Sequence, residues 1–249
     1  MRLYNTQQLL PDEARQQIAR VTLSAFLEAT LHDQTGYLPL FRDPRAGAAW
    51  LPDTVYLARC GDSATRLAAT FDDDLDLTTG SLPGVTLQGD NLTTWREGRP
   101  LTRELTRLED RAVYLGWDSQ KQPGSASFAL HCGSSCQFAL QGRSVLTFAL
   151  GDANGSAAPI DLTVELADRR GNAARLPLSR YAFVQPRIAA PLFKAAWLST
   201  RPTSEVVLQT FEFPLAQFAA ANPAFDLASL AEVRLVFDRT PAGLLVLDD

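Results

Sequence analysis

Several features that would point directly to a function are missing from this sequence. No run approaches the ~20 apolar residues of a membrane-spanning helix, and residues 1–10 have neither the basic nor the apolar region of a signal peptide. No GxSxG motif occurs, so the nucleophile elbow of a serine hydrolase is absent. We therefore expect no membrane span, and we assign no catalytic residue to the chain.

The chain also lacks an excess of positive charge. It has 23 Lys and Arg against 28 Asp and Glu, a net charge of −5, and residues 61–90 account for all of it with six acids and one arginine. A protein that binds nucleic acid needs a basic face to neutralise phosphates. The balance therefore argues against nucleic acid as a partner.

Histidine is scarce as well, because only His32 and His131 are present. His32 follows a predicted helix, where a solvated residue is common, and no acid stands near His131 in the sequence. An ester hydrolase that uses His131 with Ser134 and Ser135, without a recognised motif, is the alternative function that we keep open. Whether the chain is an enzyme is therefore undecided at this point.

Three cysteines cannot all pair within one chain. Cys132 and Cys136 flank a Gly-Ser-Ser stretch that lets the chain turn, which favours a local disulfide closing a hairpin loop. Two free thiols, or a zinc ion with Cys60 as a further ligand, are the alternatives. A disulfide would favour an extracytoplasmic compartment.

One long helix is predicted near the N-terminus. From Pro11 to Leu31 apolar residues recur at spacings of three and four, and Asp12 and Glu13 are acids expected in a first turn. Such a helix cannot bury its own apolar face and must dock on a partner. Residues 33–61 are broken by Gly and Pro but stay apolar, so we expect an extended segment that wraps a neighbouring surface.

From residue 64 onward the apolar pattern changes to a period of two. About ten strands are predicted, and the clearest runs are Arg66–Phe71, Ala112–Trp117, Val145–Leu150, Ile160–Leu166, Glu205–Phe213 and Val233–Phe237. Only brief helical patches intervene, at Pro191–Leu198 and Pro214–Ala221, which excludes parallel βαβ units. The prediction is a mainly β, antiparallel jelly-roll β-sandwich over residues 64–249, preceded by the amphipathic helix and extended segment of residues 1–63.

Acidic residues stand near both ends of this β region. Asp72 and Asp73 follow the first predicted strand, and Asp248 closes the last. If those strands pair, the carboxylates share an oxygen-rich site, and hard oxygen ligands suit calcium. We therefore predict a structural calcium ion held by Asp72, Asp73 and Asp248, with a solvated acidic turn as the alternative.

Four aromatic residues are candidates for a platform that binds a polysaccharide, foremost Trp95, Tyr114 and Trp117, together with Tyr181. An aromatic face beside polar side chains suits a sugar, whose C–H groups are apolar and whose hydroxyls need partners. Trp95 precedes Arg96, and Trp117 precedes Asp118. The alternative for each ring is a place in the core.

The C-terminal part resembles a known family. Residues 227–243 (LASLAEVRLVFDRTPAG), with Leu247, Asp248 and Asp249, resemble the last two strands of galactose-binding-like jelly rolls, and residues 69–74 (ATFDDD) are similar to their first strand. Such domains occur as carbohydrate-binding modules and accessory domains of secreted bacterial proteins. Over residues 64–249 the resemblance implies this fold, acids that help hold calcium, a polysaccharide or other polymer as partner, and an extracytoplasmic or secreted location.

Residues 1–63 resemble a different family. Tyr4-Asn5-Thr6 and the helix after it are similar to the C-terminal end of bacterial α/β-hydrolases of the lipase and esterase type. The histidine, nucleophile and acid of that family are absent here, so no catalytic residue is carried over. The resemblance implies a noncatalytic accessory region of a larger secreted hydrolase-type protein, with a hydrolase-like domain as its partner.

Overall fold

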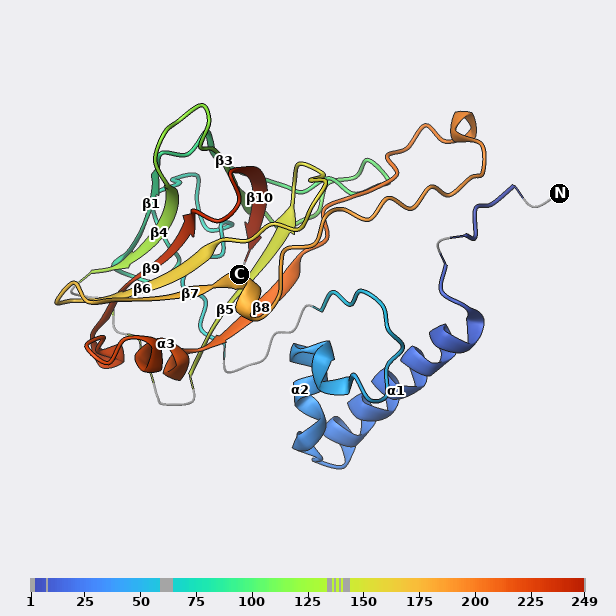
Figure 1. The fold of residues 1–249 in the computed structure, drawn as a ribbon, viewed down its shortest axis with the longest axis horizontal. Coiled ribbons are helices and arrows are strands. Elements are labelled where there is room, and N and C mark those ends of the chain that lie inside the picture. Colours follow the sequence, from blue (N-terminus) through green and yellow to red (C-terminus); the bar gives the residue numbers. More distant parts are fainter. Residues whose placement is uncertain are drawn as a thin grey trace.

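Within the part of the chain that the computed structural model describes, residues 3–7, 9–58, 65–133, 136, 138, 140 and 144–248, ten strands form two antiparallel sheets (Figure 1). The first sheet has the order β1 (Val85–Asp90), β4 (Ala126–Cys132), β9 (Leu230–Phe237), β6 (Thr163–Asp168) and β7 (Ala173–Pro177). The second has the order β2 (Thr94–Gly98), β3 (Ala112–Asp118), β10 (Ala242–Asp248), β5 (Val145–Asp152) and β8 (Gln209–Pro214).

The connections make this sandwich a jelly roll. Strands β3, β10, β5 and β8 are neighbours in one sheet, and β4, β9, β6 and β7 are neighbours in the other. The chain therefore crosses between the sheets at each step from β3 to β6 and again from β7 to β10, as in two interlocked Greek keys. Strands β1 and β2 add one edge strand to each sheet. The predicted mainly β, antiparallel jelly-roll β-sandwich is confirmed.

Alternating side chains place the core between the sheets. Strand β8 directs Phe211 and Phe213 inward, where they are 2% and 0% exposed. Phe148 on β5 stacks against both rings, with centroid distances of 5.9 and 5.7 Å. Helix α3 (Leu215–Ala221), which matches the predicted patch at Pro214–Ala221, adds the fully buried Phe218. The aromatic and β-branched residues of the predicted strands thus supply the core.

The strand expected at Arg66–Phe71 is wrong. The backbone N–H groups of Ser81 and Leu82 donate to Ala68 O at 3.0 and 3.4 Å, but the segment has no strand assignment. Phe71 turns the chain with a φ of 62° and buries its ring at 8% exposure. A left-handed residue cannot continue an extended strand. The segment is therefore an irregular turn ahead of β1, in which Phe71 is buried and Leu67 is exposed.

Three further boundaries differ from expectation. Strand β6 begins at Thr163 rather than Ile160, and β8 begins at Gln209 rather than Glu205. The side chain of Glu205 instead accepts a hydrogen bond from Arg103 N at 2.7 Å, which holds it in a loop. Over Pro191–Leu198 the structure has only a 3-10 turn, Ala196–Leu198, at the tip of a long excursion from the sandwich (Figure 1).

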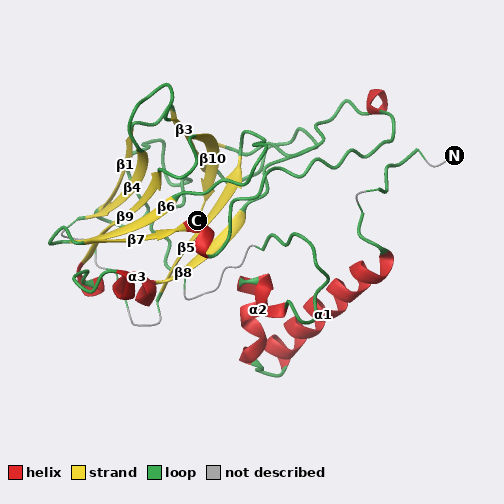
Figure 2. Ribbon diagram, viewed as in Figure 1, coloured by secondary structure: helices red, strands yellow, loops and turns green. Residues whose placement is uncertain are grey.

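The predicted long helix is present as α1 (Asp12–Leu31), and it packs against α2 (Leu38–Arg42) beside the sandwich (Figure 2). Phe26 meets the ring of Phe41 edge-on at 6.2 Å, and Ala25 is buried. The extended segment expected over residues 33–61 begins with helical turns, Thr35–Tyr37, α2 and Pro44–Gly47, because its prolines fit the first turn of a helix. From residue 48 to residue 58 it is irregular, as expected.

The predicted boundary between residues 63 and 64 lies outside the described residues, as does Cys60. In the described part of the chain, no helix is long and apolar enough to cross a membrane.

Asp168 fastens the turn between β6 and β7 to a distant loop. Its carboxylate accepts hydrogen bonds from Asn172 Nδ2 at 2.9 Å, from Asp226 N at 3.1 Å, and from the backbone N–H groups of Arg170 and Asn172. The Asn172 side chain and these N–H groups lower the pKa of Asp168 to about 2. The turn therefore depends on an ionised carboxylate.

We expect Asp168→Asn to lower the melting temperature near neutral pH, because an amide cannot accept all of these bonds. The wild-type contribution is present above the unfolded pKa of ~3.9 and is lost as the pH falls toward about 2. The difference in melting temperature between variant and wild type should therefore shrink over that window in circular dichroism melts. Asp12→Asn on exposed α1 is the control, and a difference that stays constant down to about pH 2 would contradict this role.

Candidate functional site

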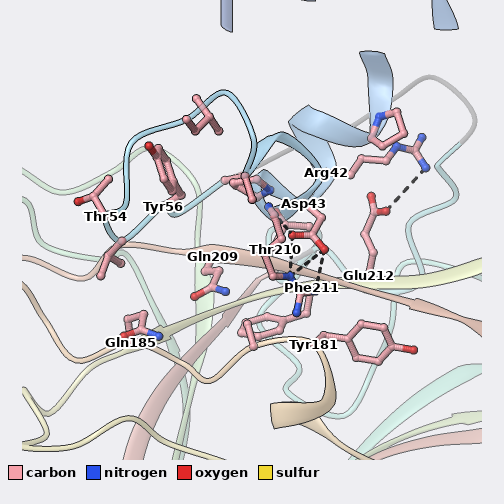
Figure 3. Close-up of a pocket in the computed structure, with 18 of the residues that line it drawn as sticks. Arg42, Asp43, Thr54, Tyr56, Tyr181, Gln185, Gln209, Thr210, Phe211 and Glu212 are labelled. Carbon is pink, nitrogen blue, oxygen red and sulfur yellow. Dashed lines mark hydrogen bonds and ion pairs between the residues drawn. The ribbon is translucent and has the colours of Figure 1, made fainter. Parts of the chain in front are cut away.

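A cleft of about 800 Å³ lies between the N-terminal segment and an edge of the second sheet (Figure 3). One wall consists of the end of α2, the turn Pro44–Gly47 and residues 48–58. The other consists of β8 and the segment after β7 that carries Tyr181 and Gln185. The cleft thus joins the two predicted regions of the chain.

The sequence builds this cleft by covering an edge strand incompletely. Strand β8 is the last in its sheet, and an exposed edge offers unpaired N–H and C=O groups. The chain near residue 58 satisfies one of them, because Thr210 N donates to Ala58 O at 2.9 Å. Pro39, Pro44 and Pro52 line the opposite wall and keep that segment from pairing along the whole strand. A space remains between the two walls.

Charged side chains line the mouth of the cleft. Arg45 Nε and Nη2 donate to the Asp43 carboxylate at 2.8 and 2.7 Å, and burial alone would raise the pKa of Asp43, but the hydrogen bonds from Arg45 prevail and hold it below its ordinary value. Arg42 Nη1 lies 3.7 Å from Glu212 Oε2, which links the two walls. Asp43 is therefore held in its charged form by Arg45, and Glu212 lies opposite Arg42.

One buried polar atom of a cleft residue, Gln209 Oε1, finds no hydrogen-bond partner in the described part of the protein. In the view of Figure 3, the Gln209 amide projects between Tyr56 and Gln185. Burial raises the pKa of Tyr181 on the same wall, opposed by the charge of Arg180 and by a side-chain hydrogen bond with it. Buried polar groups are almost always satisfied in native proteins, so Gln209 Oε1 calls for a partner from outside.

The predicted aromatic platform is not exposed. Trp117 is 2% exposed, stacks on Phe237 at 4.4 Å and donates from Nε1 to Thr240 O at 2.7 Å. Trp95 pairs with Leu115 in the β2–β3 register and packs edge-on against Phe128 at 6.2 Å. Both indoles sit at inward positions of their strands, so the core alternative describes them.

Tyr114 lies on the opposite, outer face of its sheet but is also covered. It is 9% exposed, and the Arg96 guanidinium lies 3.9 Å above its ring. Tyr114 and Trp117 are therefore buried and Trp95 is partly buried, while Tyr181 lines the cleft beside β8.

The predicted calcium ligands are only partly brought together. Strand β10, with Asp248 buried at its end, pairs with β3 and β5 rather than with a strand over residues 66–71. Asp72 accepts a hydrogen bond from Arg111 N at 2.9 Å, next to β3, so it lies at the same end of the sheet as Asp248. Asp73 accepts from Thr70 Oγ1 instead.

No group of three or more His, Cys, Asp or Glu residues in the described ranges is placed to hold a metal ion. Asp249 is outside those ranges. The calcium ion held by Asp72, Asp73 and Asp248 stays a prediction.

The cysteine and histidine expectations have different outcomes. Cys132 and Cys136 form the predicted disulfide. His131 Nδ1 lies 3.3 Å from Glu232 Oε2, an acid on the neighbouring strand β9 that sequence distance concealed. Ser134 and Ser135, the nucleophiles of the alternative ester hydrolase, are outside the described residues.

Of the polar residues of the cleft, sequence reasoning named only Tyr181, as a ring on which a sugar could stack. Arg42 and Asp43 belong to a segment that was expected to be an extended wrap, while Gln209 and Glu212 lie in a predicted strand. The one available signal was the change from polar to apolar residues along β8, where Gln209 takes an inward position ahead of Phe211 and Phe213. A polar residue at an inward position marks a place where the core ends.

Comparison with known proteins gives likenesses of structure alone. No family model matches the chain, and no curated protein matches it in sequence. Among solved structures it is similar to an exo-β-agarase, at 10% identity over 74% of this chain and 25% of that one, with a TM-score of 0.47. It is also similar to a family 30 carbohydrate-binding module, at 16% identity over 64% of this chain and 75% of that one, with a TM-score of 0.43.

A third similar structure is the family 30 carbohydrate-binding module of a cellulosomal cellulase of Clostridium thermocellum, at 14% identity over 64% of this chain and 91% of that one, with a TM-score of 0.40. The present chain spans about a quarter of the length of the agarase. All three TM-scores are below 0.5, so we draw no functional conclusion from them.

Proposed function

We propose that this chain is a noncatalytic accessory region that binds carbohydrate, with the cleft beside β8 as its binding site. The observation that carries the proposal is the unpartnered buried atom Gln209 Oε1, in a residue that lines an open cleft. A sugar hydroxyl both donates and accepts hydrogen bonds, so a saccharide can donate to this amide oxygen.

The rest of the cleft suits the same ligand. Proline and aliphatic side chains, including Pro39, Pro52 and Val55, supply apolar surface for the C–H faces of a sugar ring. Arg42, Gln185 and Glu212 have planar groups with at least two polar atoms each, which can bond two neighbouring hydroxyls. A volume of about 800 Å³ lies within the usual range for small-molecule sites.

The state of the carboxylates supports a role in binding rather than in hydrolysis. Cleavage of a glycosidic bond by a pair of carboxyl groups requires one with a raised pKa to protonate the leaving group. In the cleft, Arg45 holds the pKa of Asp43 below its ordinary value, and Glu212 is paired with Arg42. These two of the three acids that line the cleft are thus arranged as ion-pair partners.

The finer parts of the proposal rest on other observations. As a partner, we propose a hydrolase-like domain of a larger parent protein, since α1 leaves Leu23, Leu27 and Leu31 between 42% and 70% exposed. The disulfide Cys132–Cys136 supports an extracytoplasmic or secreted location. The structural calcium ion remains part of this proposal, to be tested by melting the protein with and without a chelator.

The binding site can be tested with Gln185→Ala/Gln209→Ala. We expect wild-type protein to be retarded by at least one soluble glycan in affinity electrophoresis. The double variant should bind that glycan roughly tenfold more weakly, because each lost hydrogen bond is worth about 0.5–1.5 kcal/mol. Gln88→Ala, on the exposed face of β1, is the matched control.

Two results would overturn the proposal. If folded wild-type protein is retarded by none of a broad panel of neutral and acidic glycans, the carbohydrate function is wrong. If a glycan binds the double variant and the wild type equally well, the site lies elsewhere on the chain.

A further inference from the structure

A second pocket, of about 640 Å³, lies at the opposite edge of the same sheet, beside β2. Its lining is almost entirely charged and consists of Asp72, Arg96, Glu97, Gly98, Arg99, Arg107 and Arg111. Four arginines therefore meet in one place on a chain whose net charge is −5.

A tied-down loop brings two of these arginines together. Residues 99–110 fold back on themselves: Leu101 and Arg107 form an antiparallel bridge, and Leu108 N donates to Pro100 O at 3.0 Å. The loop is anchored to the long excursion, because Arg103 N donates to Glu205 Oε2 at 2.7 Å. Arg99 and Arg107 thus project from a braced loop.

The other two arginines are fixed by the sheet. The Arg96 guanidinium lies 3.9 Å above the Tyr114 ring, and a Cβ at Gly98 would come within 2.7 Å of Arg96 Nη1. Any side chain at position 98 would therefore push this guanidinium aside. Arg111 Nη1 lies 3.9 Å from Glu97 Oε2 at the base of the pocket.

Four carboxylates lie near these arginines: Asp72, Asp74, Asp76 and Glu97. Asp72 accepts from the Arg111 backbone, while Asp74 and Asp76 accept hydrogen bonds from N–H and O–H groups of their own loop. Burial raises the pKa of Glu97, opposed by Arg111, and the charges of Asp74, Asp72 and Asp76 raise it further. The arginines are thus matched in number by acids, but Arg99 and Arg107 have no ion pair or side-chain hydrogen bond among the described residues, so their N–H donors are left for a ligand.

We propose that this pocket binds an oxyanion, the sulfate or carboxylate group of an acidic saccharide or the same group as a free anion. Guanidinium groups match carboxylate and sulfate oxygens with paired N–H donors, and several on a preorganised loop lose little entropy on binding. The site goes beyond the proposed carbohydrate function, because it lies at the far edge of the sheet from the β8 cleft and does not need that cleft to bind.

The test uses a sulfated disaccharide, the same disaccharide without sulfate, and inorganic sulfate, each titrated calorimetrically at low ionic strength. We expect the sulfated sugar to bind, the unsulfated sugar not to bind at this pocket, and Arg99→Gln/Arg107→Gln to weaken binding at least tenfold. Arg15→Gln/Arg20→Gln on α1 removes the same charge at exposed positions and should have no effect. Binding of inorganic sulfate with the same variant pattern identifies a free anion as the ligand.

Glu97→Gln provides a result that a merely structural role would not produce. It removes the negative charge from the base of the pocket and should tighten binding of the sulfated disaccharide several-fold. The proposal is overturned if no anionic probe binds. It is also overturned if Arg99→Gln/Arg107→Gln and Arg15→Gln/Arg20→Gln weaken binding equally, since an equal loss reflects the net charge of the protein alone. These outcomes are independent of the β8 cleft, whose variants Gln185→Ala and Gln209→Ala should leave anion binding unchanged.

Discussion

Trp117→Ala should reduce the free energy of unfolding by about 3–5 kcal/mol, the usual cost of deleting a large aromatic side chain from a core. The indole is 2% exposed and stacks on Phe237, and its N–H bonds Thr240 O. The surrounding backbone is fitted to the ring, because a Cβ at Gly243 would lie 2.5 Å from Trp117 Cη2. Such a tight site cannot fully collapse around alanine.

Urea denaturation followed by circular dichroism measures this loss. Trp197→Ala is the matched control, since Trp197 is 82% exposed and its removal should change stability by less than about 0.5 kcal/mol. A Trp117→Ala variant as stable as wild type would mean that the indole is not part of the core. The prediction therefore separates a core residue from a surface platform for sugar.

The second large effect concerns a charged network on the outer face of the first sheet. Glu165 on β6 is opposite Arg175 on β7 and opposite Arg234 on β9. Its side chain is 4% exposed, Arg234 Nη1 donates to it at 2.9 Å, and Arg175 Nε donates to it as well. The two arginines neutralise the carboxylate and also cover it.

Arg175→Met/Arg234→Met should destabilise the protein by about 3 kcal/mol, the low end for stranding a buried charge. Methionine keeps the cover of each arginine stem while it removes the charge, and the 61% exposure of Arg175 argues against a larger value. Adding Glu165→Met should restore stability to within about 1 kcal/mol of wild type in the same denaturation assay. A double variant that unfolds like wild type would show that Glu165 does not depend on these partners.

The sequence predicted the sandwich well because its signal is local. Runs such as Ala112–Trp117 and Val233–Phe237 alternate inward and outward residues within a single strand, and the structure has strands at both places. The failure at Arg66–Phe71 has a local cause too, because the run has strand composition but ends in a left-handed turn at Phe71. Composition alone does not specify that dihedral angle.

The site was hidden because its residues are far apart in the chain. The wall near Arg42 and Asp43 meets Gln209 and Glu212 only after the N-terminal segment docks on the β8 edge. His131 and Glu232 are a similar case, joined through the β4–β9 register. Alternation shows that successive residues of a strand point to opposite faces of the sheet, but not which face is the core. The orientation of Trp95 and Trp117 therefore became known only from the pairing of their strands.

The most direct test of the carbohydrate proposal is to map a bound oligosaccharide by amide chemical-shift changes in NMR, using a glycan that retards the protein. The account predicts that the largest changes cluster at residues 54–58, 181–185 and 209–212, which line the β8 cleft. Gln185→Ala/Gln209→Ala should reduce them several-fold at the same subsaturating glycan concentration. Changes confined to the outer face of the first sheet, around Arg175 and Arg234, would contradict the account.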